Sequence, residues 1–305
     1  MSIAFHPQTV IGVAVFLSIL EYFLIPYFGK IMKRIGFVGV DLHKSNKPKI
    51  PKGGLILSFF FLVFLGFLFL LTNEIRIAYI IIACVLFTVY GFTDDFLQVG
   101  KYKKSVLAIV AAVLTVVFSG LSGLQFILGV LFVIGVSNLI NNFAGLNGLE
   151  IGCSTIIALF LTLILFMKEN IISAYATLGI FLILVSFLIH NKYPARIFPG
   201  NTGTLLIGGF FASITLYYDA WLVLIPLMSL HIIDCILKVS TVGFYSSTEV
   251  KPTRIMKSGL LNPGKEYLSV AKLILNIKRF KENDIVNLIW FIQAGVGMIT
   301  LSLLG

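Results

Sequence analysis

Apolar segments of close to 20 residues recur along this whole chain, and they constrain its fold more than any other feature. A helix of about 20 residues matches the hydrocarbon thickness of a bilayer. The segments are too long for the strands of a membrane β-barrel, so helices are the structure that can satisfy their backbone groups within lipid. The composition agrees, because 58% of the 305 residues are hydrophobic and 12% are charged. An ordinary soluble domain with a charged surface is therefore excluded.

The hydropathy pattern predicts an all-α, polytopic membrane protein with about ten transmembrane helices in a single domain over residues 1–305. A further amphipathic helix at the membrane surface is expected within residues 272–284. Cys84, Cys153 and Cys235 lack metal-ligand spacing, and we interpret them as small buried hydrophobic residues. The predicted transmembrane helices cover residues 8–28, 53–72, 76–92, 104–119, 122–138, 149–167, 171–190, 203–218, 220–240 and 285–305.

Lysine and arginine are distributed unevenly between the two sides of the predicted membrane protein. Of the 23 basic residues, all except Arg76 and Lys168 follow the first, third, seventh or ninth predicted helix or lie at its end. Positively charged loops are retained in the cytoplasm during insertion, so these loops are predicted to be cytoplasmic and both termini to face the other side. This topology, with attraction to anionic membrane lipids, accounts for the net charge of +10, and no nucleic-acid partner is expected.

Four polar clusters lie on the predicted cytoplasmic face, and the first is a pair of adjacent carboxylates. Asp94 and Asp95 follow the third predicted helix. Two such charges repel each other and are costly beside hydrocarbon, so they favour a bound cation. Mg²⁺ is the natural candidate, because it binds one or two carboxylates together with phosphate oxygens. A solvated helix end balanced by Lys101, Lys103 and Lys104 is the alternative interpretation.

The second cluster, residues 138–150, joins the fifth and sixth predicted helices without a basic residue. Its amides can donate and accept hydrogen bonds, and its glycines allow close approach of the backbone. These properties suit a nucleotide or a sugar phosphate, although a tight polar turn is the alternative. The candidate substrate-binding residues of this cluster are Asn138, Asn142, Asn147, Gly148 and Glu150.

The third cluster, residues 193–204, opens the eighth predicted helix with the sequence Gly-Asn-Thr-Gly-Thr. Hydroxyls and unpaired backbone N–H groups at a helix N-terminus favour anions through the helix dipole. Thr202 and the preceding Arg196 are therefore candidate substrate-binding residues. Ordinary capping of the helix by Asn201 or Thr202 would explain the same sequence.

The fourth cluster, residues 41–54, leads into the second predicted helix. Asp41, Lys44 and Lys52 are its candidate substrate-binding residues, because lysines can clamp phosphates, although a retained basic loop is the competing interpretation. Together the four clusters predict an enzyme that joins a membrane lipid to a soluble phosphorylated compound. A transporter or flippase and a catalytically inactive scaffold are the alternatives from other classes of protein.

In their order along the chain, from residues 41–54 to residues 193–204, the four clusters resemble the polyprenyl-phosphate N-acetylhexosamine-1-phosphate transferases across most of the sequence. The sequence Phe-Ala-Gly-Leu-Asn-Gly-Leu-Glu, which ends at Glu150, is similar to the eukaryotic and archaeal branch that starts N-glycans. The resemblance implies transfer of N-acetylglucosamine 1-phosphate from UDP-N-acetylglucosamine to dolichyl phosphate or a similar polyprenyl phosphate, with release of UMP. A transferase that starts a cell-wall or envelope polymer from UDP-muropeptide or another UDP-acetamido sugar is the nearest alternative.

The resemblance also implies roles for particular residues. Asp94 and Asp95 would be catalytic, and the Mg²⁺ cofactor, which Mn²⁺ could replace, would be held by these two together with Asn142 and Asn201. The family normally has an aspartate at the position of Asn201, so the metal would lose one negative charge from its ligands. Arg254 stands where relatives carry a histidine cluster or a Pro-Arg-His-Arg motif, and it would clamp the diphosphate. Whether the chain forms a homodimer is left open.

Overall fold

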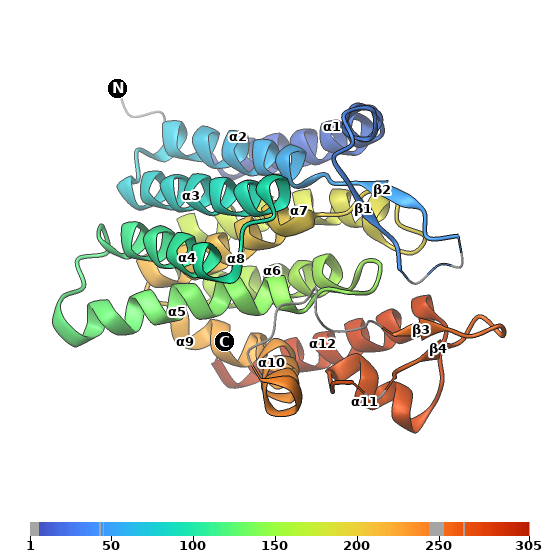
Figure 1. Cartoon of the computed structure of the whole chain (residues 1–305). Helices are drawn as coiled ribbons and strands as arrows, with labels where there is room; N and C mark the ends of the chain where they lie inside the picture. Colours follow the sequence, from blue (N-terminus) through green and yellow to red (C-terminus); the bar gives the residue numbers. More distant parts are fainter. Residues whose placement is uncertain (1–5, 43, 45, 244–252, 265, 305) are drawn as a thin grey trace.

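The computed structural model describes residues 6–42, 44, 46–243, 253–264 and 266–304, and most of this part of the chain is helical (Figure 1). Its helices are α1 (Pro7–Arg34), α2 (Gly54–Thr72), α3 (Ile75–Leu97), α4 (Lys101–Val116), α5 (Gly123–Asn142), α6 (Leu149–Met167), α7 (Ile171–Asn191), α8 (Gly200–Tyr217), α9 (Trp221–Leu227), α10 (Ser229–Val242), α11 (Val270–Ile277) and α12 (Glu282–Leu304). Two short antiparallel pairs accompany them, β1 (Val38–Val40) with β2 (Lys49–Pro51), and β3 (Arg254–Ile255) with β4 (Leu261–Asn262).

All ten predicted hydrophobic segments are helical, with one break. The ninth is split into α9 and α10, which meet at an angle of 64°. Pro226 lies just before this break, and a proline inside a helix removes a backbone donor and clashes with the preceding turn. The helix expected within residues 272–284 is present in part as α11, which begins at Val270 and ends at Ile277, while residues 282–284 belong to α12. Its position at the membrane surface stays a prediction.

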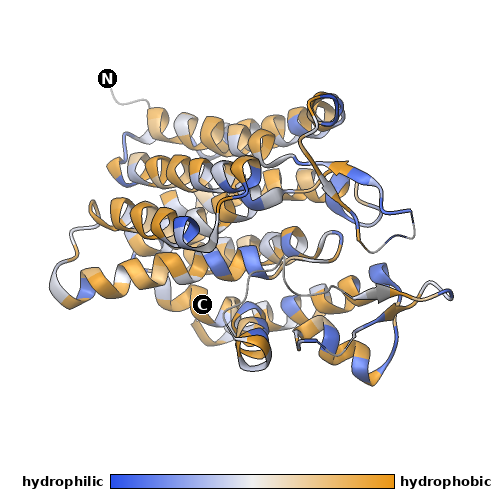
Figure 2. Ribbon diagram, viewed as in Figure 1, coloured by the Kyte–Doolittle hydropathy of each residue, from blue (hydrophilic) through white to orange (hydrophobic). Residues whose placement is uncertain are grey.

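The chain is an all-α, polytopic membrane protein. Within the described residues, seven helices are long and apolar enough to cross a membrane, and the bent α9–α10 pair can form an eighth span. Helix α4 has only 16 residues, and α8 has 18 and begins with polar residues, so a count of ten spans stays a prediction. Figure 2 shows mostly hydrophobic residues along the helices and hydrophilic residues around the strands and at several helix ends. The seven helices are α1, α2, α3, α5, α6, α7 and α12.

Helix α8 lies at the centre of the bundle, between α3 and α5, and almost every residue after its first two is buried. Glycines bring its first turn against two neighbours. A Cβ added to Gly91 of α3 would lie 2.5 Å from the carbonyl oxygen of Asn201, and one added to Gly54 of α2 would lie 2.5 Å from the backbone nitrogen of Gly203. Only residues without a side chain allow such an approach. The end of α3, the start of α2 and the start of α8 are therefore held together.

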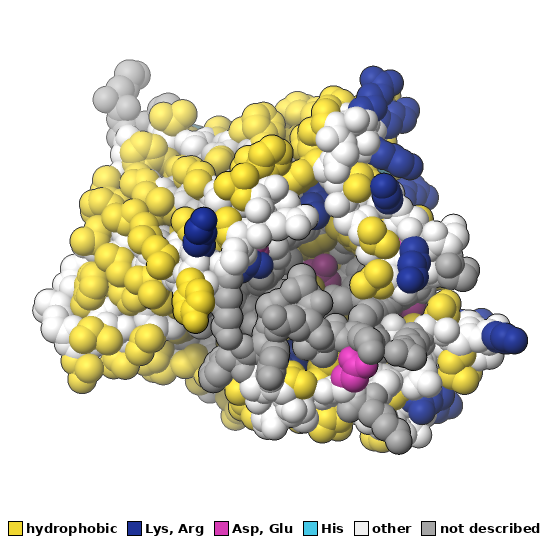
Figure 3. All heavy atoms as spheres, viewed as in Figure 1, with side chains coloured by type: hydrophobic (Ala, Val, Ile, Leu, Met, Phe, Trp, Pro, Cys, Tyr) yellow, Lys and Arg dark blue, Asp and Glu magenta, His cyan; other side chains and the backbone are white. Residues whose placement is uncertain are grey.

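The segments that follow α1, α3, α5 and α7 meet at one end of the bundle. Strand β2 continues into a backbone bridge between Lys52 and Phe198, which joins the first of these segments to the fourth. Figure 3 shows lysine and arginine side chains gathered mostly at the end where β1 and β2 lie, while hydrophobic side chains cover the opposite part of this face. A second, smaller hydrophobic cluster, which includes Phe143, Leu261 and Ile289, packs α11 and the start of α12 against the loop after α5.

Candidate active site

Asp95 lies in the last turn of α3 and is held from two sides. Its Oδ1 is 2.8 Å from the Nζ of Lys52, immediately before α2. Its Oδ2 accepts hydrogen bonds from the backbone N–H of Thr202 at 2.8 Å and from the Thr202 hydroxyl at 2.7 Å. The side chain of Asp95 is only 1% exposed. Hydrogen bonds to a charged group contribute about 1.5–3 kcal/mol each, so these contacts fix the carboxylate where α2, α3 and α8 meet.

Asp94 is the second buried carboxylate, and different groups hold it. The side-chain amide of Asn201 donates to its Oδ2 at 2.8 Å, and the Nζ of Lys104 in α4 lies 2.9 Å from its Oδ1. The interpretation of this pair as a solvated helix end is wrong, because both carboxylates are buried, although Lys104 does balance Asp94 as that interpretation expected. Helix capping by Asn201 or Thr202 is also not observed, because Pro199 occupies the N-cap of α8 and no side chain caps it.

A separate set of polar contacts, which we call the Asp41 contacts, joins three distant parts of the chain. The side-chain amide of Asn147 donates to Oδ2 of Asp41 at 3.0 Å, and the Nζ of Lys44 lies 2.8 Å from the same oxygen. The backbone N–H of Asn147 donates to Oε1 of Glu282, the first residue of α12, at 2.8 Å. Asp41, Asn147 and Glu282 are each at most 5% exposed. The loop after α1, the loop after α5 and the start of α12 are thus tied together.

Gly148 and Glu150 lie next to the Asp41 contacts, at the start of α6. Gly148 has a positive φ of 82°, and a Cβ there would lie 3.0 Å from the Cα of Lys192. Its carbonyl oxygen accepts a hydrogen bond from the indole of Trp290 in α12 at 3.2 Å. Glu150 is buried in the first turn of α6, and its Oε2 has no hydrogen-bond partner among the described residues. Gly148 is required by the backbone, whereas Glu150 offers an unused carboxylate oxygen.

The remaining predicted residues take part neither in the contacts around Asp94 and Asp95 nor in the Asp41 contacts. The amide of Asn138 donates to the carbonyl of Ile134 in its own helix at 2.8 Å, while the side chains of Asn142 and Arg196 are exposed. Arg254 pairs through its backbone in β3, and its side chain lies outside the described residues. Their roles in substrate or metal binding stay predictions. Asn138 is the residue whose contact, within its own helix, gives least support to such a role.

Two contacts were not predicted from the sequence. Glu282 stands in a charged stretch before an apolar segment, where an acidic residue at a helix N-terminus is unremarkable, so no local signal marks its contact with Asn147. Asn141 accepts a hydrogen bond from the hydroxyl of Thr204 at 2.6 Å. This bond joins the end of α5 to the first turn of α8, which links the loop after α5 to the segment that holds both aspartates.

The sequence of this chain is similar to those of known glycosyltransferases. The family model of glycosyl transferase family 4 matches residues 77–219. A protein of Methanocaldococcus jannaschii named as a glycosyltransferase is 34% identical, with 86% of each chain covered. A Saccharolobus solfataricus protein named as a UDP-N-acetylglucosamine–dolichyl-phosphate N-acetylglucosaminephosphotransferase is 29% identical over 95% of this chain and 97% of its own. A phospho-N-acetylmuramoyl-pentapeptide-transferase of Prochlorococcus marinus is 26% identical over 95% of this chain and 88% of its own.

Proposed function

The chain belongs to glycosyl transferase family 4, and from that premise we propose that it transfers N-acetylglucosamine 1-phosphate from UDP-N-acetylglucosamine to dolichyl phosphate or another polyprenyl phosphate, with release of UMP. The names of the Saccharolobus solfataricus relative and of one from Sulfolobus acidocaldarius, 30% identical, support this donor and acceptor. The Prochlorococcus marinus relative, which is more distant, supports a UDP-muropeptide donor as the second candidate.

One observation carries the proposal. Buried carboxylates converge with amides, hydroxyls and partly exposed lysines from four connecting segments at one end of the bundle, and hydrophobic side chains cover the opposite part of the face in Figure 3. A lipid phosphate at the membrane surface and a nucleotide in the surrounding water can both reach such a site. We place this end on the cytoplasmic side, because all basic residues except Arg76 and Lys168 follow the first, third, seventh or ninth predicted helix or lie at its end, and positively charged segments stay in the cytoplasm.

Asp94 and Asp95 are the proposed Mg²⁺ ligands, and the donor set at this junction fits that ion. The described residues contain no group of three or more His, Cys, Asp or Glu that could hold a metal. Mg²⁺ does not need one, because it commonly binds through one or two carboxylates and takes phosphate oxygens and waters as its other ligands. Asp94 is the more available ligand, because its ion-pair partner Lys104 is 39% exposed, whereas Asp95 already accepts three contacts. Asn201 would add an amide oxygen.

In the proposed reaction an oxygen of the lipid phosphate attacks the phosphorus that carries the sugar. A phosphorus–oxygen bond to the lipid phosphate forms, the bond to UMP breaks, and UMP leaves with the negative charge. Bound Mg²⁺ would neutralise charge on the diphosphate. Such transfers depend mainly on positioning and on charge stabilisation. The residues of this chain would supply both, since Lys52 and Lys104 add positive charge beside the aspartates and Thr202 keeps Asp95 in place.

The assignment of the two carboxylates is tested by Asp94→Asn and Asp95→Asn variants, with Asp219→Asn as the matched control. Asp219 is exposed just beyond the far end of α8, so the same chemical change there should leave activity intact. We expect each site variant to lose at least about 100-fold in the rate of UMP release, as when a preorganised charge-stabilising group is removed. Full activity in a site variant whose thermal unfolding matches that of the wild type would show that the assignment is wrong.

A further inference from the structure

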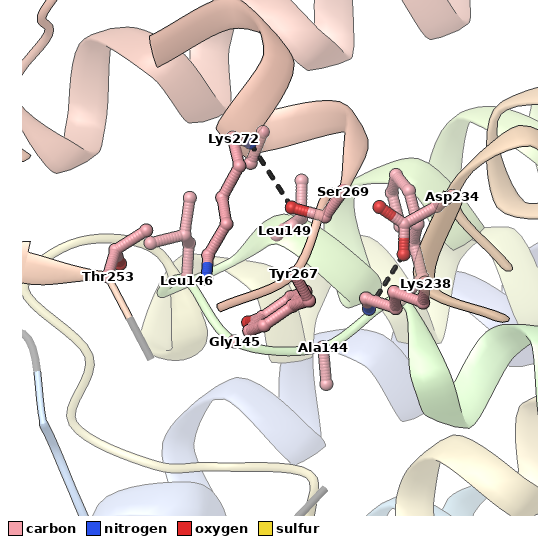
Figure 4. Close-up of a pocket in the computed structure, with 12 residues that line it drawn as sticks. Ala144, Gly145, Leu146, Leu149, Asp234, Lys238, Thr253, Tyr267, Ser269 and Lys272 are labelled. Atoms are coloured by element: carbon pink, nitrogen blue, oxygen red, sulfur yellow. Dashed lines mark hydrogen bonds and ion pairs between the residues drawn. The ribbon is translucent and has the colours of Figure 1, made fainter. Parts of the chain in front are cut away.

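A small pocket lies between the loop that follows α5, helix α10 and the segment that leads into α11 (Figure 4). It encloses about 50 Å³, whereas one water needs roughly 10–15 Å³. A group with the size of a phosphate therefore fits, and a whole sugar nucleotide does not. The residues that line it include Gly145, Leu146, Asp234, Lys238, Tyr267 and Lys272.

Lys272, in the first turn of α11, extends into this pocket. Figure 4 shows its side chain running from the helix towards Tyr267 and Leu146. Lys272 is 1% exposed, and its Nζ has no hydrogen-bond partner among the described residues. The Nζ lies 3.2 Å from the centre of the Tyr267 ring, which offers the electron-rich face of an aromatic group and no anionic oxygen. A buried ammonium without an acceptor is costly, so this position favours an anion from outside the chain.

The other lysine that lines the pocket is fully engaged. Lys238 Nζ lies 2.7 Å from Oδ2 of Asp234 and donates to the carbonyl of Asn142 at 2.5 Å. The other carboxylate oxygen of Asp234 accepts a hydrogen bond from the backbone N–H of Val270 at 2.8 Å. The negative charge of Asp234 is thus committed to Lys238 and to the backbone. Burial lowers the pKa of Lys272 to about 8, against the opposing effect of Glu266.

The pocket adjoins the candidate active site through the loop that follows α5. This loop lines the pocket at Gly145 and Leu146 and, one residue later, joins Asp41 and Glu282 through Asn147. We propose that the pocket is a binding site for a phosphoryl group of a substrate, with the Lys272 ammonium as its charged donor. This inference rests on the proposed function, because the nucleotide diphosphate and the polyprenyl phosphate are the two sources of that group.

The test compares Lys272→Met, which removes the charge at similar length, with Lys272→Arg, which keeps it. Binding of UMP, of uridine and of a short-chain polyprenyl phosphate to the full chain in detergent is measured by calorimetry. We expect Lys272→Met to weaken binding of one phosphorylated ligand at least tenfold, which corresponds to about 1.4 kcal/mol. Lys272→Arg should recover most of the loss, and uridine should bind all three proteins equally. The ligand whose binding is weakened by Lys272→Met identifies the source of the phosphoryl group.

Equal affinity of the wild type and Lys272→Met for both phosphorylated ligands would overturn the inference, as would a wild type that binds neither. Thermal unfolding distinguishes a binding role of Lys272 from a structural role. Removal of an unpaired buried charge should leave the unfolding midpoint of Lys272→Met unchanged or raised, whereas loss of a structural contact would lower it. UMP release from UDP-N-acetylglucosamine is measured in parallel. If the wild type turns over and Lys272→Met binds both phosphorylated ligands with unchanged affinity, phosphoryl binding in the pocket is refuted and the proposed function still stands. If UMP binding depends on Lys272 but the wild type shows no turnover, the binding role of the pocket is supported and the proposed function is contradicted.

Discussion

Gly91→Ala changes no chemical group at the candidate active site, yet we expect it to reduce activity about 100-fold. The added Cβ would lie 2.5 Å from the carbonyl oxygen of Asn201, whereas ordinary contact begins at 3.4 Å, so α3 and α8 would have to separate by about 0.9 Å. The hydrogen bonds from Thr202 to Asp95, now 2.7 and 2.8 Å, would then stretch beyond the usual range. A misplacement of about 1 Å commonly costs about 100-fold in rate.

The assay for Gly91→Ala is Mg²⁺-dependent UMP release in detergent, with thermal unfolding measured on the same preparations. Overpacking of this kind should lower the free energy of unfolding by about 1–3 kcal/mol. Gly66→Ala in α2 is the matched control, because a Cβ there meets no atom within 4 Å. It should keep full activity and gain about 0.5–1 kcal/mol, since alanine favours a helix over glycine. A folded Gly91→Ala variant with wild-type activity would refute the argument that this helix contact positions the aspartates.

Three further changes have definite expected outcomes. Asn201→Asp should lower the Mg²⁺ concentration needed for half-maximal UMP release, because it adds a carboxylate to the proposed ligands, and an unchanged requirement would contradict this. Glu282→Ala should lower the free energy of unfolding by about 1–3 kcal/mol by leaving a buried N–H unpaired, whereas Glu282→Gln keeps the acceptor and should lose less. Burial lowers the pKa of Lys272 from 10.5 to about 8, so the unfolded chain binds more protons between these values. The unfolding midpoint of the wild type should therefore rise relative to that of Lys272→Met from about pH 8 to 10.5, with Glu266 and Lys238 the same in both; a constant difference would refute it.

The membrane fold could be predicted from the sequence because each span is encoded locally. A segment such as residues 53–72 carries its own length and hydrophobicity, and the corresponding helix α2 begins and ends within one residue of the prediction. The break between α9 and α10 was missed, since the whole segment is apolar and a single proline at residue 226 can also be accommodated by a kink. Local hydropathy also cannot show that α8 is surrounded by other helices.

The candidate active site was partly predictable for a different reason. Asp94 and Asp95 are conspicuous because two carboxylates beside an apolar segment are costly, and Asn201 and Thr202 are conspicuous because they open a helix. Their direct contact, across 107 residues of sequence, is a property of the packing of α3 on α8. Lys272 was one of many basic residues in its segment, and only the fold shows that it is buried and unpaired.

The account is tested most directly by UMP release from the purified chain, with polyprenyl phosphate and Mg²⁺, across UDP-N-acetylglucosamine, UDP-N-acetylgalactosamine and UDP-muropeptide. The proposed function predicts Mg²⁺-dependent release with UDP-N-acetylglucosamine and a lipid product that carries the sugar through a diphosphate. Release with UDP-muropeptide instead would favour the second candidate. No release with any of the three donors, from protein shown to be folded, would contradict the central claim that this site transfers a sugar phosphate from one of these donors to a lipid.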